Sequence, residues 1–137
     1  MTVLASPGSV AHTLIVKRCG GRCEICARTG LPINFAHRRH RGMGGGPDTL
    51  WALANGVAAC GSGTTGCHGW CHDNPELAKA GGWILGNGED PETAPVWLRT
   101  LNYGPAWVRL RGDDLIEWFD PVTAGLPDRP VLPEWAA

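Results

Sequence analysis

The sequence contains no apolar run long enough to cross a bilayer, which excludes a transmembrane protein. Its first eighteen residues lack the basic start and the long apolar stretch of a secretory signal peptide. Charged residues make up only 18% of the chain, but 43% of it is hydrophobic, and this balance excludes a disordered chain. We therefore expect a cytoplasmic protein with no membrane partner, whose 137 residues form one domain around a modest core.

The sequence also lacks an excess of basic charge, because its formal net charge is −1. Taken alone, this value argues against a nucleic-acid-binding protein. The charge is nevertheless divided unevenly. Residues 1–50 contain seven basic and two acidic side chains, a net charge of +5, whereas residues 51–137 contain five basic and eleven acidic ones, a net charge of −6. Arg38, Arg39 and Arg41 form a compact basic run that can neutralise phosphates, although such a run is more often a solvated loop.

The class of protein is indicated by its six cysteines, which are Cys19, Cys23, Cys26, Cys60, Cys67 and Cys71. An even number permits disulfides, but we do not expect this chain in an oxidising compartment. Two of the cysteines form a C-x2-C pair in a turn bracketed by glycines, where two thiolates can bind one tetrahedral ion. We predict a structural Zn²⁺ held by Cys23, Cys26, Cys60 and Cys67. Either Cys19 or Cys71 is an alternative for one of these four ligands.

Periodicity and turn residues predict an α+β fold made of short elements. Helices are predicted over residues 9–18, 48–53, 65–73 and 75–80, with Ser9 capping the first and Asp48 the second. Strands are predicted over residues 33–38, 56–60, 83–85, 94–98, 106–111 and 114–119. We expect the first two strands to pair, and we expect the Gly-rich segment 41–47 between them to be a loop.

Three histidines and one asparagine stand at ordered positions among these elements. His37 lies at the end of the first predicted strand, and Asn55 lies at the start of the second. His68 and His72 are four residues apart on a predicted helix, so both side chains project from one face and can bind one metal ion. The order is thus a strand with His, a Gly-rich loop, a strand with Asn and a helix with His, all held between cysteine pairs.

This order carries a resemblance to a known family. The segments concerned are CEIC at 23–26, FAHRRHRGMGG at 35–45, LANGVAAC at 53–60 and CHGWCHDNP at 67–75. With these segments, roughly residues 19–85 resemble the HNH (ββα-metal) endonucleases, and their motifs look most like those of the small HNH proteins of actinobacteriophages. The resemblance implies a zinc-clamped ββα-metal nuclease core. An N-terminal tail and short helix (1–18) would precede it, and an acidic extension of short strands (86–137) would pack on it.

The resemblance also implies roles in the metal-dependent hydrolysis of double-stranded DNA. His37 matches the general base that activates water. Asn55 matches the middle letter of the motif, which either fixes the hairpin that carries the base or helps to hold the metal. His68 matches the last letter and would bind the catalytic ion, with His72 as a second ligand. That ion, Mg²⁺, Mn²⁺, Ni²⁺ or Zn²⁺, would stabilise the phosphate and the leaving group.

Further expectations follow from the same resemblance. The flanking DNA backbone would be held by Arg38, Arg39 and Arg41. Small phage proteins of this kind assist a terminase in genome packaging, so a terminase is the expected protein partner, and the host cytoplasm the expected location. No small-molecule cofactor is expected.

One position departs from the family pattern. Many members have Asp or His just before the base, and that residue binds the catalytic metal, but here it is Ala36. The ion would then depend on the two helix histidines, with His40 as a further candidate ligand. Two alternatives stay open. His68 can belong to a Cys3His zinc site, and the whole fold can be a non-catalytic, zinc-stabilised module that binds DNA or protein.

Overall fold

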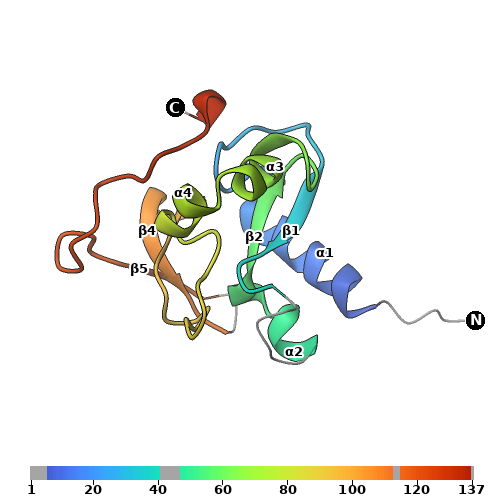
Figure 1. Ribbon diagram of the computed structural model, residues 1–137. Helices are drawn as coiled ribbons and strands as arrows, with labels where there is room; N and C mark the ends of the chain where they lie inside the picture. The colour runs from blue at the N-terminus through green and yellow to red at the C-terminus, as the bar shows by residue number, and fades with distance from the viewer. Residues whose placement is uncertain (1–5, 41–46, 113–114, 137) are drawn as a thin grey trace, which may run out of the picture.

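The computed structural model describes residues 6–40, 47–112 and 115–136. The fold is α+β, as predicted, with one antiparallel sheet of two strands and one of three (Figure 1). Its helical elements are α1 (Pro7–Cys19), α2 (Pro47–Leu50), η2 (Leu53–Asn55), α3 (Gly66–Asp73), α4 (Pro75–Ala80) and η3 (Glu134–Ala136). Its strands are β1 (Ile33–His37), β2 (Gly56–Cys60), β3 (Val96–Thr100), β4 (Gly104–Leu110) and β5 (Ile116–Trp118). Within the ranges described, no helix combines the length and the hydrophobicity that a membrane span requires.

The hairpin of β1 and β2 lies between two helices. Its strands pair in antiparallel register, with Phe35 opposite Ala58 and His37 opposite Gly56. Phe35 and Ala58 face α1, where they form a small apolar cluster with Ile15. The alternate residues of both strands face the main core. Helix α3 lies against the hairpin on that side (Figure 1). Because both faces are covered, all of β2 is buried, and the predicted pairing of the two strands is confirmed.

Gly56 allows an aromatic ring to close over the hairpin. A Cβ atom at this position would stand 2.4 Å from Cζ of Phe35, which is closer than non-bonded atoms can approach. The ring of Phe35 in turn lies 5.1 Å from the ring of His37, and the ring of Trp51 lies 4.6 Å from it. The missing side chain at Gly56 therefore lets the Phe35 ring pack beside His37 at the end of β1, where Trp51 contacts the same imidazole.

Helix α1 begins earlier than the sequence predicts. Its N-cap is Ser6, whose hydroxyl accepts a hydrogen bond from the backbone N–H of Ser9 at 3.1 Å. Pro7 occupies the first helical position, where a missing N–H costs nothing. The expectation that Ser9 caps this helix is thus wrong, because Ser9 lies inside its first turn. Gly20, with φ +65°, ends the helix in the left-handed region.

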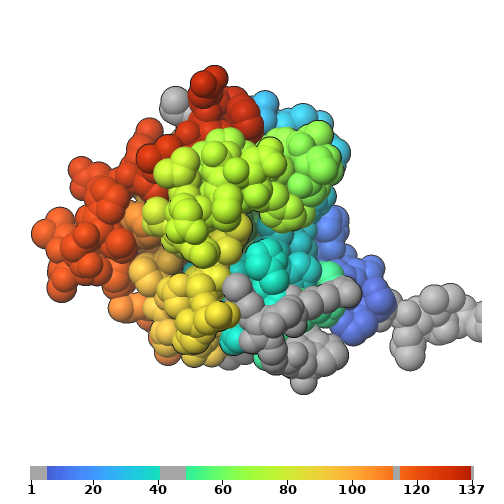
Figure 2. Space-filling model, in the orientation of Figure 1, coloured from blue at the N-terminus to red at the C-terminus, as the bar shows by residue number. Residues whose placement is uncertain are grey.

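The three-stranded sheet shares one core with the hairpin. Val96 and Val108 are buried in the same apolar cluster as Ile25 of the cysteine turn. The backbone N–H of Arg99 donates to the carbonyl of Glu24 at 2.7 Å, which joins β3 directly to that turn. In the space-filling view, the C-terminal residues (red) lie against the surface of α3 and α4 (yellow-green) (Figure 2). The acidic extension is therefore an integral part of the core.

The predicted strand over 83–85 is wrong. The backbone N–H of Trp83 donates to the carbonyl of Ala78, and that of Leu85 donates to the carbonyl of Arg38. These hydrogen bonds close the end of α4 and attach the segment to the end of β1, so no ladder with a neighbouring strand forms. The apolar run is buried because it fills the core, and a buried run need not be a strand.

Other predicted elements differ in their bounds. The predicted helix 48–53 is divided into α2 and η2, and Asp48 lies inside α2 rather than before it. The last predicted strand, 114–119, is confirmed only over the three residues of β5. Helices α3 and α4 match their predictions closely. Most of the predicted loop 41–47 falls outside the described residues.

Candidate functional site

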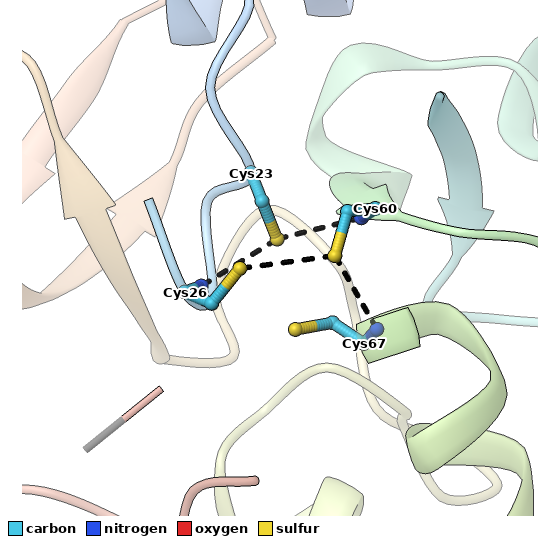
Figure 3. Close-up of side chains that lie close together, drawn as sticks. All are labelled: Cys23, Cys26, Cys60 and Cys67. Carbon is cyan, nitrogen blue, oxygen red and sulfur yellow. Dashed lines mark hydrogen bonds between the residues drawn. The ribbon is translucent and has the colours of Figure 1, made fainter. Parts of the chain in front are cut away.

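Four buried cysteines meet at one point in the core. Cys23 and Cys26 come from the turn after α1, Cys60 ends β2, and Cys67 lies in the first turn of α3 (Figure 3). Their Sγ atoms all lie within 4.8 Å of one another. The Sγ atoms of Cys26 and Cys60 are 3.7 Å apart, which matches the roughly 3.8 Å between two sulfurs on a tetrahedral zinc. The predicted grouping is confirmed, and it can hold a structural zinc.

The alternative ligands lie outside this cluster. The Sγ of Cys19 donates to the carbonyl of Val16 at 3.4 Å, and burial raises the pKa of this thiol. Burial likewise raises the pKa of Cys71 to about 12. His68 is not a member of the cluster either, so the structure does not contain the Cys3His arrangement that the sequence left open. This frees His68 for a different site.

Backbone N–H groups surround the sulfurs of this cysteine cluster. The N–H groups of Ile25, Cys26 and Cys60 donate to Cys23 Sγ at 3.4, 3.5 and 3.4 Å. The N–H of Cys67 donates to Cys60 Sγ at 3.5 Å, as Figure 3 also shows. Donors aimed at sulfur favour the thiolate, which is the form that binds a metal ion. The fold therefore supplies the outer hydrogen bonds that a zinc–thiolate site requires.

Two side chains that the sequence analysis missed complete this shell. Arg28 Nε donates to Cys26 Sγ at 3.4 Å, and Arg28 Nη2 lies 3.8 Å from Cys60 Sγ. Trp135 Nε1 donates to Cys67 Sγ at 3.3 Å, and the Arg28 guanidinium lies 5.5 Å from the centre of the Trp135 ring. The position of Arg28 close to the C-x2-C pair in the sequence could have indicated its contact with these sulfurs. Nothing in the sequence connected Trp135 with a cysteine 68 positions earlier.

The cysteine cluster has the protonation chemistry of a metal site. The interaction between the two sulfurs lowers the pKa of Cys23 and raises the pKa of Cys67. Burial raises the pKa of Cys60. A set of four sulfur donors in tetrahedral reach of one another is typical of structural zinc rather than of a hard ion. The donor set therefore fits Zn²⁺.

A small, mostly apolar pocket beside the cysteine cluster is lined in part by histidines. His37, His68 and His72 line this pocket together with Ala36 and the buried thiol of Cys71. The space inside is about 10 Å³, which is room for about one water-sized group. The rings of His68 and His72 meet edge to face, with their centroids 4.7 Å apart. The structure thus brings together the three histidines that the sequence selected.

His68 contacts the first strand of the hairpin. Its Nδ1 lies 2.8 Å from Oδ1 of Asn34, a residue of β1 that the sequence analysis did not select. Burial lowers the pKa of His68, and the neighbouring His72 and His37 lower it further. A lowered pKa keeps the imidazole neutral at neutral pH, which is the state that can bind a metal ion.

Asn55 acts on the backbone and not in the pocket. Its side-chain Oδ1 accepts from the backbone N–H of Arg39 at 2.7 Å, and its Nδ2 donates to the carbonyls of Arg39 and Leu50 at 3.2 Å. Its own carbonyl accepts from the N–H of Arg38 at 2.8 Å. Asn55 is fully buried by these contacts. Of the two roles that the resemblance allows, the structure therefore supports fixing the hairpin that carries His37.

The prediction that Arg38 binds DNA is wrong. Its side chain is completely buried, with 0% exposure. It donates hydrogen bonds of 2.8 to 3.5 Å to five backbone carbonyls, those of Ala54, Gly82, Pro91, Ala94 and Pro95. A guanidinium has five N–H groups, and here they bind the segment after α4 to the end of β1. Arg38 is a structural clamp between the hairpin and the rest of the core.

The neighbours of Arg38 lie differently. Arg39 is half-buried, and its backbone is held by Asn55. His40 is exposed, and its ring centroid lies 6.4 Å from that of His72. Arg41 lies outside the described residues. The described part of the basic run therefore offers Arg39 and His40 near the pocket.

The histidine pocket offers fewer ligands than the cysteine cluster. Among the residues that the structure describes, the four cysteines are the one set of three or more metal-binding side chains within mutual reach. Ala36 lines the pocket at the position where the family pattern has an acidic residue or histidine. The pocket therefore offers His68 and His72 as two imidazole ligands, and an ion there would take its remaining ligands from water and substrate.

Comparisons of the chain with protein-family models, with curated proteins and with solved structures find no significant match.

Proposed function

We propose that this protein is a metal-dependent endonuclease of the HNH type, which hydrolyses phosphodiester bonds in double-stranded DNA. The observation that carries the proposal is the meeting of His37, His68 and His72 around one pocket. A hairpin that ends in one histidine and a following helix that carries two others match the order expected of this family. The cysteine cluster supports it further, because it joins β2 to α3 beside the pocket.

In this proposal His37 is the general base. A neutral imidazole is suited to take a proton from water at neutral pH. Packing against Phe35 and Trp51 restricts the rotation of its ring, and Asn55 fixes the backbone that follows it. These contacts hold the base in one orientation toward the pocket.

The two histidines of α3 would hold the catalytic ion. When bound, a divalent ion neutralises the charge that develops on the phosphate and on the leaving oxygen. Two imidazoles favour a transition ion such as Mn²⁺, Ni²⁺ or Zn²⁺ over Mg²⁺. Arg39 would hold the flanking DNA backbone without reading its sequence. The proposed partner of the protein in the cell is a phage terminase, an expectation tested by co-purification of the full-length chain with that enzyme.

A second function has an observation in its favour. Ala36 leaves the pocket with two imidazoles, and a metal site with so few protein ligands is weak. A zinc-stabilised module that binds DNA without cutting it would need no catalytic ion. His37 and His68 line one pocket, and this argues for the nuclease, because a binding module has no use for a base beside a second histidine.

Plasmid nicking separates the two functions. Protein that retains its tightly bound zinc is stripped of loosely bound metal and incubated with supercoiled DNA and Mg²⁺, Mn²⁺, Ni²⁺ or Zn²⁺ in turn. The nuclease predicts metal-dependent nicking that is lost in His37→Ala and in His68→Ala. The control His12→Gln changes an exposed histidine of α1 that does not line the pocket, and it should nick like the native protein. Salt-sensitive DNA binding without nicking under any metal would instead support the binding module.

A further inference from the structure

We propose that Asn34 is a positioning residue that holds His68 in the tautomer with its proton on Nδ1. The inference deepens the proposed function, since it concerns the histidine that would bind the catalytic ion. Asn34 lies in β1, where it pairs with Ala59 of β2, and its side chain is half-buried. Its Oδ1 lies 2.8 Å from Nδ1 of His68, which belongs to α3, 34 residues later in the chain.

The placement of the Asn34 amide oxygen toward the ring determines the direction of this hydrogen bond. An amide oxygen only accepts, so the His68 Nδ1 at 2.8 Å must carry the hydrogen. A neutral imidazole has one such hydrogen, and therefore Nε2 keeps its lone pair. That nitrogen is the one left to bind an ion at the pocket that His68 lines with His37 and His72. Histidine ligands of metal ions are oriented in this way by a partner on the opposite ring nitrogen.

The placement of Asn34 on its strand makes this role specific. Asn34 and Ala36 are two residues apart in β1, so they lie on the same face of the hairpin, the face on the side of α3. Ala36 provides no metal ligand, whereas Asn34 provides an acceptor for His68. Strand β1 thus contributes to binding of the proposed ion indirectly, because Asn34 orients the ring of His68. Because the pocket offers few ligands, a fixed orientation of the His68 ring contributes more to ion binding than it would in a site with three or four ligands.

The test is a direct measurement of the tautomer. Long-range ¹H–¹⁵N correlation spectra of zinc-loaded protein at pH 8 distinguish a protonated from an unprotonated ring nitrogen, and His68→Gln assigns the signals. We expect native His68 to be protonated on Nδ1. Asn34→Leu, which has a similar shape but no acceptor, should produce a mixture of tautomers, whereas Asn34→Asp, which restores an acceptor, should keep the native state. His72 serves as an internal control in each spectrum. Protonation of native His68 on Nε2, or no change in Asn34→Leu, would overturn the proposal.

Binding of a metal probe gives a second readout. Zinc-loaded protein is titrated with Ni²⁺, and the His68 and His72 signals are followed. Loss of an outer-shell partner typically weakens a metal site by about 10–100-fold, and we expect an effect in this range for Asn34→Leu and a much smaller one for Asn34→Asp. Circular dichroism verifies that each variant is folded, and Asn34→Ala replaces Asn34→Leu if that variant does not fold.

The outcomes separate the two proposals. If the protein never nicks DNA but shows the Asn34-dependent tautomer, the proposed nuclease activity is wrong and the role of Asn34 stands. If the native protein and Asn34→Leu nick DNA equally well and their His68 tautomers are the same, the proposed nuclease activity stands and the role of Asn34 is wrong.

Discussion

The indole N–H of Trp135 donates to the Sγ of Cys67 at 3.3 Å, so the last described helical turn rests on the cysteine cluster. Arg28 lies over the same indole ring and donates to Cys26 Sγ, which places the turn after α1 and the C-terminal segment around one set of sulfurs. Occupation of the cluster by zinc and docking of the C-terminal segment should therefore stabilise each other. The structure thus couples the cysteine cluster to the C-terminal segment that carries η3.

Trp135→Phe is expected to accelerate the loss of zinc. Phenylalanine keeps an aromatic ring under Arg28 but removes the N–H that donates to Cys67. A hydrogen bond of this kind contributes about 0.5–1.5 kcal/mol, which corresponds to a roughly two- to tenfold weaker site. Competition with a chromogenic zinc chelator measures the effect. Trp118→Phe, at a tryptophan that is 58% exposed, is the matched control. Equal zinc retention in both variants would show that the N–H does not matter.

Arg38→Lys is expected to destabilise the fold without a direct effect on DNA binding. Lysine keeps the charge, but it cannot reach five carbonyls, and each buried acceptor left without a donor costs about 1–3 kcal/mol. Arg39→Gln should instead weaken DNA binding directly, because it removes the positive charge proposed to contact the DNA backbone. The salt slope of that binding should fall by about one. Urea unfolding and DNA titrations at several salt concentrations measure both effects.

The pKa of His68 predicts how stability depends on pH. Burial, then His72 and His37, lower this pKa below the ordinary value of 6.5, so the unfolded chain takes up a proton before the folded protein does. The free energy of unfolding must then decrease as the pH falls through 6.5 toward the folded pKa of His68. His68→Gln removes this contribution and should flatten the curve. Urea midpoints of zinc-loaded protein between about pH 7.5 and pH 5 give the comparison. Parallel curves for the two proteins would contradict the prediction.

Ala36→Asp is expected to strengthen binding of a divalent ion in the pocket. The new carboxylate would join His68 and His72 as a third ligand at a position that already lines the pocket. An oxygen ligand also makes Mg²⁺ and Mn²⁺ better partners than they are for two imidazoles. Calorimetric titration with Mn²⁺ tests this, with Ala36→Asn as a control of similar shape and no charge. If the carboxylate leaves ion affinity unchanged, the ion does not bind between these residues.

Much of this arrangement could be predicted from local patterns. The cysteine spacing predicted the correct four of six cysteines, because a C-x2-C turn and a Gly-rich return are sufficient to bring sulfurs together. The hairpin followed from alternation over residues 33–38 and a short apolar partner strand. His68 and His72 share a pocket because residues four apart on a helix project together.

Other residues could not be assigned in this way. Arg38 belongs to a run of arginines that suggests a phosphate-binding loop, yet it is buried because backbone carbonyls from distant segments accept its N–H groups. The run over 83–85 is apolar enough for a strand, but its backbone bonds to α4 and to the end of β1. The composition of such a segment gives its hydrophobicity but does not indicate which groups its backbone will form hydrogen bonds with.

The sequence by itself determined the α+β class, the cysteine cluster and the helix that carries two histidines, because each depends on spacings of a few residues. Only the tertiary structure decided that Asn34 faces His68, that Asn55 fixes the end of β1 and that Trp135 reaches Cys67. These contacts join residues 34, 16 and 68 positions apart. Their partners are selected by the packing of the whole core, in which every buried polar group must find a partner.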